Sequence, residues 1–205
     1  MQTISKSARL AAVVIALIAW VGLAVQLQAS SELSGSVPLA IWVMLRFFTV
    51  IANLLVAIFF TGVALRLLER MAASLLGCIT LAILFVGVVY MLLLRGLVEL
   101  SGGAKLADLL LHHVTPILVP AFWLVFAPKG ELRRVDPWLW SLLPLAYFVY
   151  AITRAAFDGR YPYPFMDVGA IGWTQTTINA VLMALGFVIG GYVMLWLDRR
   201  LSQSR

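Results

Sequence analysis

Long apolar runs, separated by short polar segments, dominate this sequence. There are six such runs, at about residues 9–28, 40–64, 73–97, 106–127, 137–157 and 171–197. A helix needs roughly 20 mostly apolar residues to cross a membrane, and each run is about that long. The runs lack the polar and apolar alternation of β-barrel strands, and an isolated strand would leave its backbone groups unpaired in lipid. We therefore predict an all-α fold, in which residues 1–205 form a single domain, a polytopic bundle of six transmembrane helices.

The composition excludes several other classes of protein. Hydrophobic residues make up 63% of the chain and charged residues 12%, with a mean hydropathy of +1.01. Soluble domains are about half apolar and about a quarter charged. The formal charge of +6 does not indicate a nucleic-acid binder, because the basic residues lie between the apolar runs and form no stripe. We expect an integral membrane protein whose partners are membrane lipids and not nucleic acid.

The distribution of Lys and Arg predicts the orientation, because these residues collect on the cytoplasmic side of a membrane. With a cytoplasmic N-terminus, the basic residues on the inside are Lys6, Arg9, Arg66, Arg70, Lys129, Arg133, Arg134, Arg199, Arg200 and Arg205. Those on the outside are Arg46, Arg95, Lys105, Arg154 and Arg160. This two-to-one bias predicts that both termini are cytoplasmic. The first run has the basic flank of a signal peptide, but it is long enough to span and five runs follow, so we expect an uncleaved helix.

Cysteine and histidine usage argues against a metal centre. Cys78 is the only cysteine, which excludes an intrachain disulfide and a cysteine-rich metal site. His112 and His113 are adjacent, so their side chains diverge by about 100° on a helix and do not easily bind one ion together. A zinc site would need Asp108 and another carboxylate. We expect neither a metal nor a cofactor.

Two sets of polar residues lie inside apolar runs, where polar groups are costly and mark helix packing, a pore or a site. The second run carries three at spacings of three and four, which predicts one shared helix face: Arg46, Thr49 and Asn53. The fourth run carries another three: Asp108, His112 and His113. Both runs enter from the same side in the predicted topology. We therefore expect the two sets to lie at similar depth and to meet.

These residue types suggest acyl transfer. Asp108 and His112 are an i, i+4 pair, so the carboxylate can accept a proton from one imidazole nitrogen and leave the other as a base. With His112 as base, the Thr49 hydroxyl can attack an ester carbonyl. Asn53 or Arg46 would then donate hydrogen bonds to the oxyanion. The alternative interpretation is structural, with the threonine and asparagine bonding across helices and the histidines capping polar contacts.

Prolines mark two further features of the chain. Pro116 and Pro120 predict a broken helix and freed carbonyl groups near Val114, because proline lacks the N–H that an interior helical position needs. In the segment Tyr161–Phe165, each of two prolines follows a tyrosine and forces extended backbone. We expect a rigid aromatic strap over the outer mouth of the bundle, where it would cover a substrate cavity; its aromatic residues are Tyr161, Tyr163 and Phe165. The alternative is an interfacial anchor that does not contact a substrate.

Three blocks of sequence carry a family resemblance: Arg46–Asn53, Leu111–Pro116 with Phe126–Gly130, and Tyr161–Phe165. In their order and spacing they resemble bacterial six-helix membrane proteins related to the androgen-induced and androgen-dependent membrane hydrolases. The resemblance covers most of the chain from the second run onward. It implies the activity of the animal relatives, which hydrolyse fatty acid esters of hydroxy fatty acids with a membrane-embedded threonine and a histidine. It implies Thr49 as the nucleophile.

The resemblance leaves the base open between two histidines. His112, four residues before Pro116, fits the bacterial pattern, and His113 fits the animal one. We expect an integral hydrolase of lipid esters in a bacterial cytoplasmic (inner) membrane, with Thr49 and His112 as its catalytic pair. The first alternative is a membrane protein that binds or transports a small amphipathic or anionic ligand without hydrolysis. The second is a scaffold that has no ligand.

Overall fold

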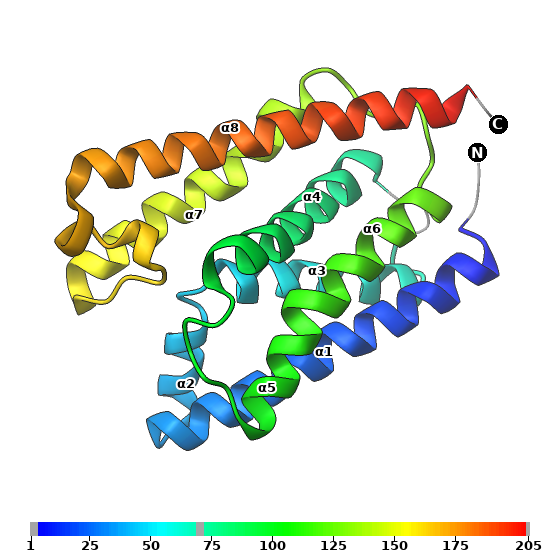
Figure 1. Ribbon diagram of the computed structural model, residues 1–205. Helices are drawn as coiled ribbons and strands as arrows, with labels where there is room; N and C mark the ends of the chain where they lie inside the picture. Colours follow the sequence, from blue (N-terminus) through cyan, green and yellow to red (C-terminus); the bar gives the residue numbers. More distant parts are fainter. Residues whose placement is uncertain (1–3, 69–71, 204–205) are drawn as a thin grey trace. The chain divides into compact units, whose positions relative to one another are not determined.

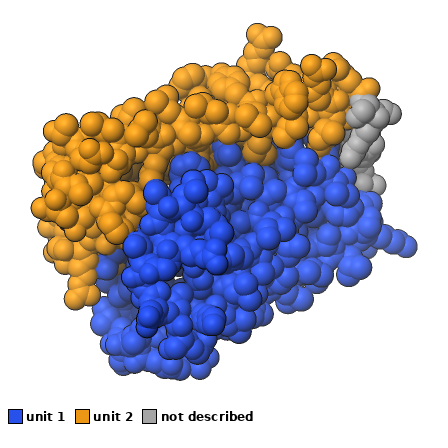
Figure 2. All heavy atoms as spheres, viewed as in Figure 1, with its two compact units in different colours: residues 1–128 blue, residues 129–205 orange. Residues whose placement is uncertain are grey.

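The computed structural model describes residues 4–68 and 72–203, which form helices joined by turns and loops, with no β-strand among them (Figure 1). The prediction of an all-α protein is confirmed. The chain divides into two compact units, residues 1–128 and residues 129–205, which Figure 2 colours separately. The expectation of a single domain stays a prediction. Arg70 and Arg205, which enter the charge count, lie outside the described residues.

The described part of unit 1 contains six α-helices and two π-helical turns. Their order is α1 (Lys6–Ser34), α2 (Val37–Met44), α3 (Phe48–Ala64), α4 (Ala73–Val89), η1 (Tyr90–Leu94), α5 (Gly102–Leu109), η2 (Leu110–Val114) and α6 (Thr115–Phe126). The turn between α1 and α2 follows from its residues. Gly35 ends α1 in the left-handed region with φ 76°, and the Ser36 hydroxyl then accepts from the Leu39 amide as the N-cap of α2.

Five helical segments are long and apolar enough to cross a membrane, and a bent pair makes up to six. The five are α1, α4 with η1, α5 through α6, α7 (Asp136–Asp158) and α8 (Val168–Ser202). The bent pair is α2 and α3. Helices of this length and composition are those of a membrane protein.

The second apolar run is not the single helix predicted over residues 40–64. It divides into α2 and α3, whose axes are bent by 98°, and Phe47 between them is extended. Arg46 lies in this break and is buried, so the prediction that it shares a helix face with Thr49 and Asn53 is wrong. Apolar content does not determine the direction of the backbone, and no glycine or proline marks the bend.

The fourth run contradicts the predicted proline break. Helix continues through Pro116, in the first turn of α6, and through Pro120 in its interior. The irregularity comes earlier, where residues 110–114 form the π-helical turn η2. A proline near the start of a helix does not need to donate a backbone hydrogen bond. The wider π turn before Pro116 therefore accommodates the missing N–H of this residue.

Close helix approach in unit 1 depends on glycine. Gly87 of α4 faces Pro116 of α6 so closely that an added Cβ would stand 2.8 Å from the Pro116 Cβ. Gly22 of α1 meets Leu111 in the same way, since an added Cβ would stand 2.7 Å from Leu111 Cδ2. A larger residue at position 87 would push the helices apart because the proline ring is rigid, whereas at position 22 the end of the Leu111 side chain would have to move. The residues of η2 are therefore held closely between neighbouring helices.

We expect Gly87→Ala to lower the free energy of unfolding by about 1–3 kcal/mol, because the new methyl group overlaps the rigid Pro116 ring. The measurement is thermal or denaturant unfolding in detergent. Gly103→Ala in α5 is the matched control, since its Cβ would meet Val25 at an ordinary 3.5 Å. It should be neutral or slightly stabilising because alanine favours helix. Equal stability of Gly87→Ala and the unmodified protein would contradict close packing at this point.

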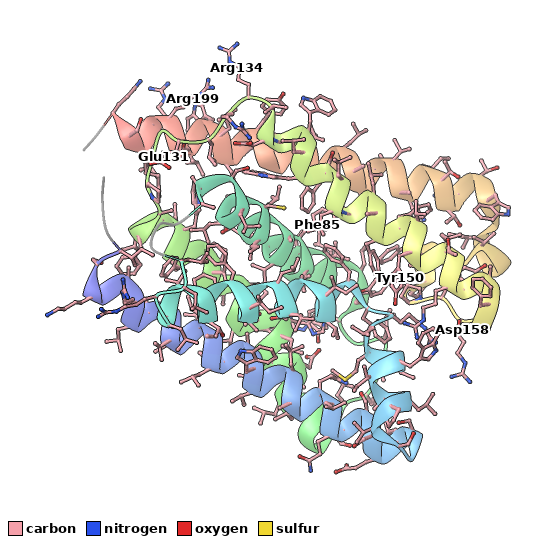
Figure 3. All side chains as sticks on the ribbon, turned by 180° about the vertical axis from the view of Figure 1, so that it is seen from behind. Phe85, Glu131, Arg134, Tyr150, Asp158 and Arg199 are labelled. Carbon is pink, nitrogen blue, oxygen red and sulfur yellow. The ribbon has the colours of Figure 1, made fainter. Side chains whose placement is uncertain are left out.

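Unit 2 is built from α7 and α8, which pack against each other, with the short 3₁₀ turn η3 (Pro164–Met166) in the connection. Fully buried Asp198 of α8 accepts from the amides of Gly130 and Leu132 at 2.9 and 3.1 Å, which fixes the loop before α7. Arg134 and Arg199 lie at this end of unit 2, and Asp158 lies at the other end of α7 (Figure 3).

Candidate active site at Thr49 and His112

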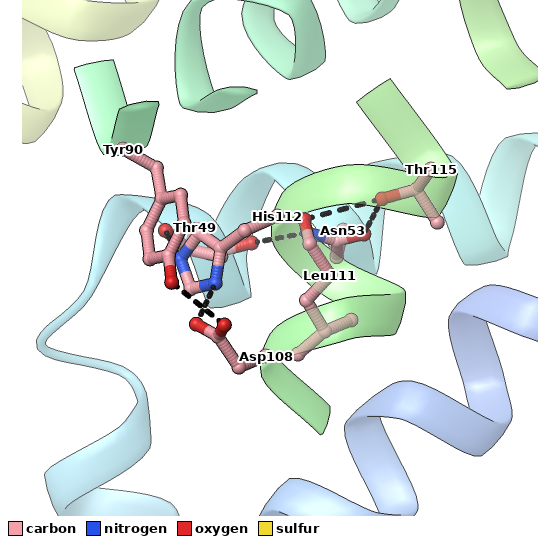
Figure 4. A network of polar contacts seen from close by, with 7 residues as sticks. All are labelled: Thr49, Asn53, Tyr90, Asp108, Leu111, His112 and Thr115. Atoms are coloured by element: carbon pink, nitrogen blue, oxygen red, sulfur yellow. Dashed lines mark hydrogen bonds and ion pairs between the residues drawn. The ribbon is translucent and has the colours of Figure 1, made fainter. Parts of the chain in front are cut away.

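Thr49 and His112 come from separate helical elements and meet in unit 1. Thr49 lies in the first turn of α3 and His112 in η2. The Thr49 Oγ1 atom is 3.1 Å from His112 Nε2, which is a hydrogen-bond distance. Figure 4 shows both residues in the network of polar contacts. Thr49 is 7% exposed, so the contact is sheltered. A hydroxyl beside an imidazole nitrogen is the pair that nucleophilic catalysis requires.

Asp108 stands on the opposite side of the same imidazole. Its Oδ1 atom is 2.9 Å from His112 Nδ1, which is an ion-pair distance. The Nδ1 atom nevertheless has no partner in hydrogen-bond geometry, so this is a close approach without an aligned N–H. A carboxylate at this position favours the tautomer in which Nδ1 carries the proton. The Nε2 lone pair then faces Thr49 and can accept its proton.

The backbone of η2 explains why a second polar pair lies close to this one. The Thr115 amide donates to Leu110 O, five residues back, and Pro116 has no N–H. The Leu111 carbonyl instead accepts from Asn53 Nδ2 at 3.2 Å and from the Thr115 hydroxyl at 3.3 Å. A buried carbonyl without a donor is costly, so the asparagine stabilises the π-helical turn on which His112 stands.

Asn53 is fully buried, and its polar atoms are occupied. Its amide nitrogen donates to Thr49 O at 2.9 Å and to Leu111 O, and its Oδ1 accepts from the Thr115 hydroxyl at 2.7 Å. Two amide hydrogens with two carbonyl partners leave none for an oxyanion. Asn53 in this arrangement holds α3 to η2 and α6, which is the structural alternative that the sequence left open for this residue.

We expect Asn53→Leu to lower the free energy of unfolding by about 1–3 kcal/mol, because Leu111 O and the Thr115 hydroxyl lose a buried partner. Thr80→Val is the matched control. Thr80 is equally buried, but its hydroxyl donates only to Leu76 O within its own helix at 2.7 Å. Unfolding in detergent should show a clear loss of stability for Asn53→Leu and a smaller loss for Thr80→Val. The reverse order would contradict the role given to Asn53.

The two adjacent histidines have different surroundings. His112 contacts Thr49 and Asp108, whereas His113 packs edge to face on Tyr90, with centroids 5.2 Å apart. The geometry therefore favours His112 over His113 as the base. The oxyanion role expected of Arg46 stays a prediction, since this buried residue lies at the break before α3 and not on the α3 face.

Tyr90 is a site residue that sequence reasoning missed. Its hydroxyl donates to Asp108 Oδ2 at 2.7 Å, and its ring stacks on His112 with centroids 4.2 Å apart and planes 18° apart. A tyrosine near the end of an apolar run has the ordinary pattern of a membrane-interface residue. No residue near Tyr90 in the sequence indicates that its hydroxyl has a partner on another helix.

The aromatic segment before α8 belongs to unit 2. The rings of Tyr163 and Phe165 stack with centroids 5.0 Å apart, and Asn179 Nδ2 donates to Phe165 O at 2.9 Å. These contacts hold Tyr163 and Phe165 within unit 2, while the rigid strap that would also include Tyr161 stays a prediction. That it covers a cavity at Thr49 stays a prediction, because Thr49 belongs to the other unit.

Within the described residues, no group of three or more His, Cys, Asp and Glu is arranged to hold a metal ion. Comparisons with protein-family models, with curated proteins and with solved structures found no match for this chain. The resemblance to membrane hydrolases stays an expectation. Unit 1 brings together the sheltered Thr49 hydroxyl of α3 with the His112 imidazole and the Asp108 carboxylate, which both come from the continuous helical segment of α5 and η2.

Proposed function

We propose that this protein is an integral membrane hydrolase of fatty acyl esters, with Thr49 as nucleophile and His112 as base. The observation that carries the proposal is the 3.1 Å contact between Thr49 Oγ1 and His112 Nε2. Asp108 on the other imidazole nitrogen supports it, because a carboxylate there stabilises the imidazolium that forms when the base takes a proton. The resemblance of the same residues to membrane hydrolases also points to this activity.

The proposed reaction has two halves. The Thr49 oxygen attacks the ester carbonyl carbon while its proton passes to His112 Nε2, which gives a tetrahedral intermediate. The bond to the alcohol oxygen then breaks, and His112 returns the proton to the leaving alcohol, so that an acyl-threonine remains. A water molecule attacks that ester with His112 again as base. The fatty acid leaves and the threonine hydroxyl is restored.

We propose a membrane topology to match this chemistry. The bent pair α2 and α3 would make one of six spans, with both termini cytoplasmic and the chain in a bacterial inner membrane. The bias of Lys and Arg toward one side supports this orientation. Thr49 would then lie toward the outer leaflet, where an acyl chain can enter sideways from lipid. The apolar surface of the spanning helices supports such an entry.

Purified protein in lipid nanodiscs should release free fatty acid from long-chain acyl esters and leave the matching ethers intact. The measurement is fatty acid formed per protein over time, by mass spectrometry. The Thr49→Ala/His112→Ala double variant sets the background. Release equal to that background for every ester would contradict the proposal. An ester analogue that still binds a Thr49→Val variant, with no turnover by the unmodified protein, would favour ligand binding or transport.

A further inference from the structure

Tyr90 brings a third helical segment to the imidazole. It is the first residue of the π-helical turn η1, at the end of α4, whereas Asp108 and His112 come from α5 and η2. The phenol makes two different contacts. Its hydroxyl reaches the carboxylate, and its ring lies flat against the imidazole (Figure 4).

The carboxylate of Asp108 is divided between two partners. Oδ1 approaches His112 Nδ1 at 2.9 Å, and Oδ2 accepts from the Tyr90 hydroxyl at 2.7 Å. Rotation of the carboxylate toward any other partner would break the bond to Tyr90. A hydrogen bond to a carboxylate in a sheltered site is also stronger than one in water. The hydroxyl therefore orients the Asp108 carboxylate.

The stacked ring restricts the imidazole itself. With planes only 18° apart and centroids 4.2 Å apart, the Tyr90 ring leaves His112 little freedom to swing out of its plane. His113, edge-on to the same phenol, packs against another part of the ring. The imidazole thus has Tyr90 against one face, Thr49 at hydrogen-bond distance from Nε2 and the Asp108 carboxylate close to Nδ1.

We infer that Tyr90 is a positioning residue, which acts through Asp108 and through its stacked ring to hold His112 with Nδ1 protonated and the Nε2 lone pair on Thr49. This inference deepens the proposed function and rests on it only for the catalytic consequence. The orientation and tautomer of His112 can be measured without any turnover.

The direct test is nitrogen-15 NMR of the protein labelled at histidine, in mildly alkaline buffer where imidazole is neutral. The chain has two histidines, and a His113→Gln variant assigns them. We expect His112 to be protonated at Nδ1 and bare at Nε2. Tyr90→Phe keeps the ring and removes the hydroxyl, and it should shift the ratio of the two tautomers by about tenfold. Tyr192→Phe in unit 2 is the control and should leave both signals unchanged.

A double-variant cycle shows whether Tyr90 acts through Asp108. Adding Tyr90→Phe to Asp108→Asn should change the tautomer ratio of His112 much less than Tyr90→Phe does alone. An equal shift in both backgrounds, or no shift in Tyr90→Phe, would overturn the inference. If Tyr90→Phe does not fold, Asp108→Asn alone should show mixed tautomers, and an unchanged tautomer there would overturn it as well.

Ester hydrolysis gives the catalytic consequence. Tyr90→Phe should lower kcat by about tenfold and leave KM close to its original value, since the hydroxyl orients the base and does not bind the acyl chain. A raised KM with unchanged kcat would contradict positioning. If the unmodified protein hydrolyses no ester, the proposed function fails, while the NMR result still decides the role of Tyr90.

Discussion

Replacing Thr49 with alanine should lower kcat for ester hydrolysis by about 1,000-fold or more. The variant removes the oxygen that we propose attacks the carbonyl, and the alanine side chain has no atom that can replace it beside His112 Nε2. Thr49→Ser keeps a hydroxyl at this position and should keep activity within about tenfold. The measurement is fatty acid release under saturating ester, with unfolding midpoints recorded for each variant.

Thr80→Ala is the matched control for this substitution. Thr80 is another buried threonine, 1% exposed, and its hydroxyl only donates to the backbone of its own helix. It should fold and hydrolyse esters at nearly the original rate. If Thr49→Ala stays folded and keeps more than about a tenth of the original activity, Thr49 is not the nucleophile.

Replacing His112 with alanine should lower kcat by about 100- to 10,000-fold, the usual range for loss of a general base. The Thr49 hydroxyl is a poor nucleophile unless a base takes its proton, and His112 Nε2 is the atom at hydrogen-bond distance. The neighbouring imidazole provides the control. His113→Ala should have only a small effect, because that ring packs on Tyr90.

The comparison of the two histidine variants decides the assignment that the sequence left open. A larger loss of activity in His113→Ala than in His112→Ala would assign the base to His113. Comparable losses in both folded variants would mean that neither imidazole acts alone as base. Activity unaffected in both would contradict histidine-dependent hydrolysis.

The helical fold could be predicted from the long apolar runs, because backbone groups in lipid must bond within the protein and these runs lack the alternation of barrel strands. The meeting of Thr49 with His112 could be anticipated because their runs enter the membrane from one side in the predicted topology. Apolar content nevertheless does not predict where a helix axis changes direction. The 98° bend before α3 has no glycine or proline to mark it, so residue spacing puts Arg46 on a helix face that it does not share.

Residues whose partners lie on another helix are the hardest to interpret from the sequence. From the sequence, Asn53 is a candidate donor to an oxyanion. Only the structure shows that its amide hydrogens already donate to the carbonyls of Thr49 and Leu111. Tyr90 has the pattern of an interface aromatic, yet its hydroxyl lies 2.7 Å from Asp108. The spacing of residues along one helix predicts which of them share a face, but not which face of a neighbouring helix they meet.

The irregular backbone of η1 and η2 is part of the arrangement of the site. Both π-helical turns carry residues that contact Asp108, namely Tyr90 and His112. A π turn rotates the side chains that follow it relative to a regular helix, and such turns are frequent at functional sites. The bond from Asn53 to Leu111 O offsets part of the cost of the turn that carries His112.

Covalent labelling shows whether Thr49 is an activated nucleophile, on which the proposed hydrolysis depends. Protein in detergent is treated with a long-chain alkyl fluorophosphonate, whose phosphorus is attacked by the nucleophile as fluoride leaves. The adduct is then located by mass spectrometry of peptides. We predict that the phosphonyl group is on Thr49 and that His112→Ala abolishes the labelling. An adduct on a different residue, or equal labelling of Thr49 in the His112→Ala variant, would contradict this role.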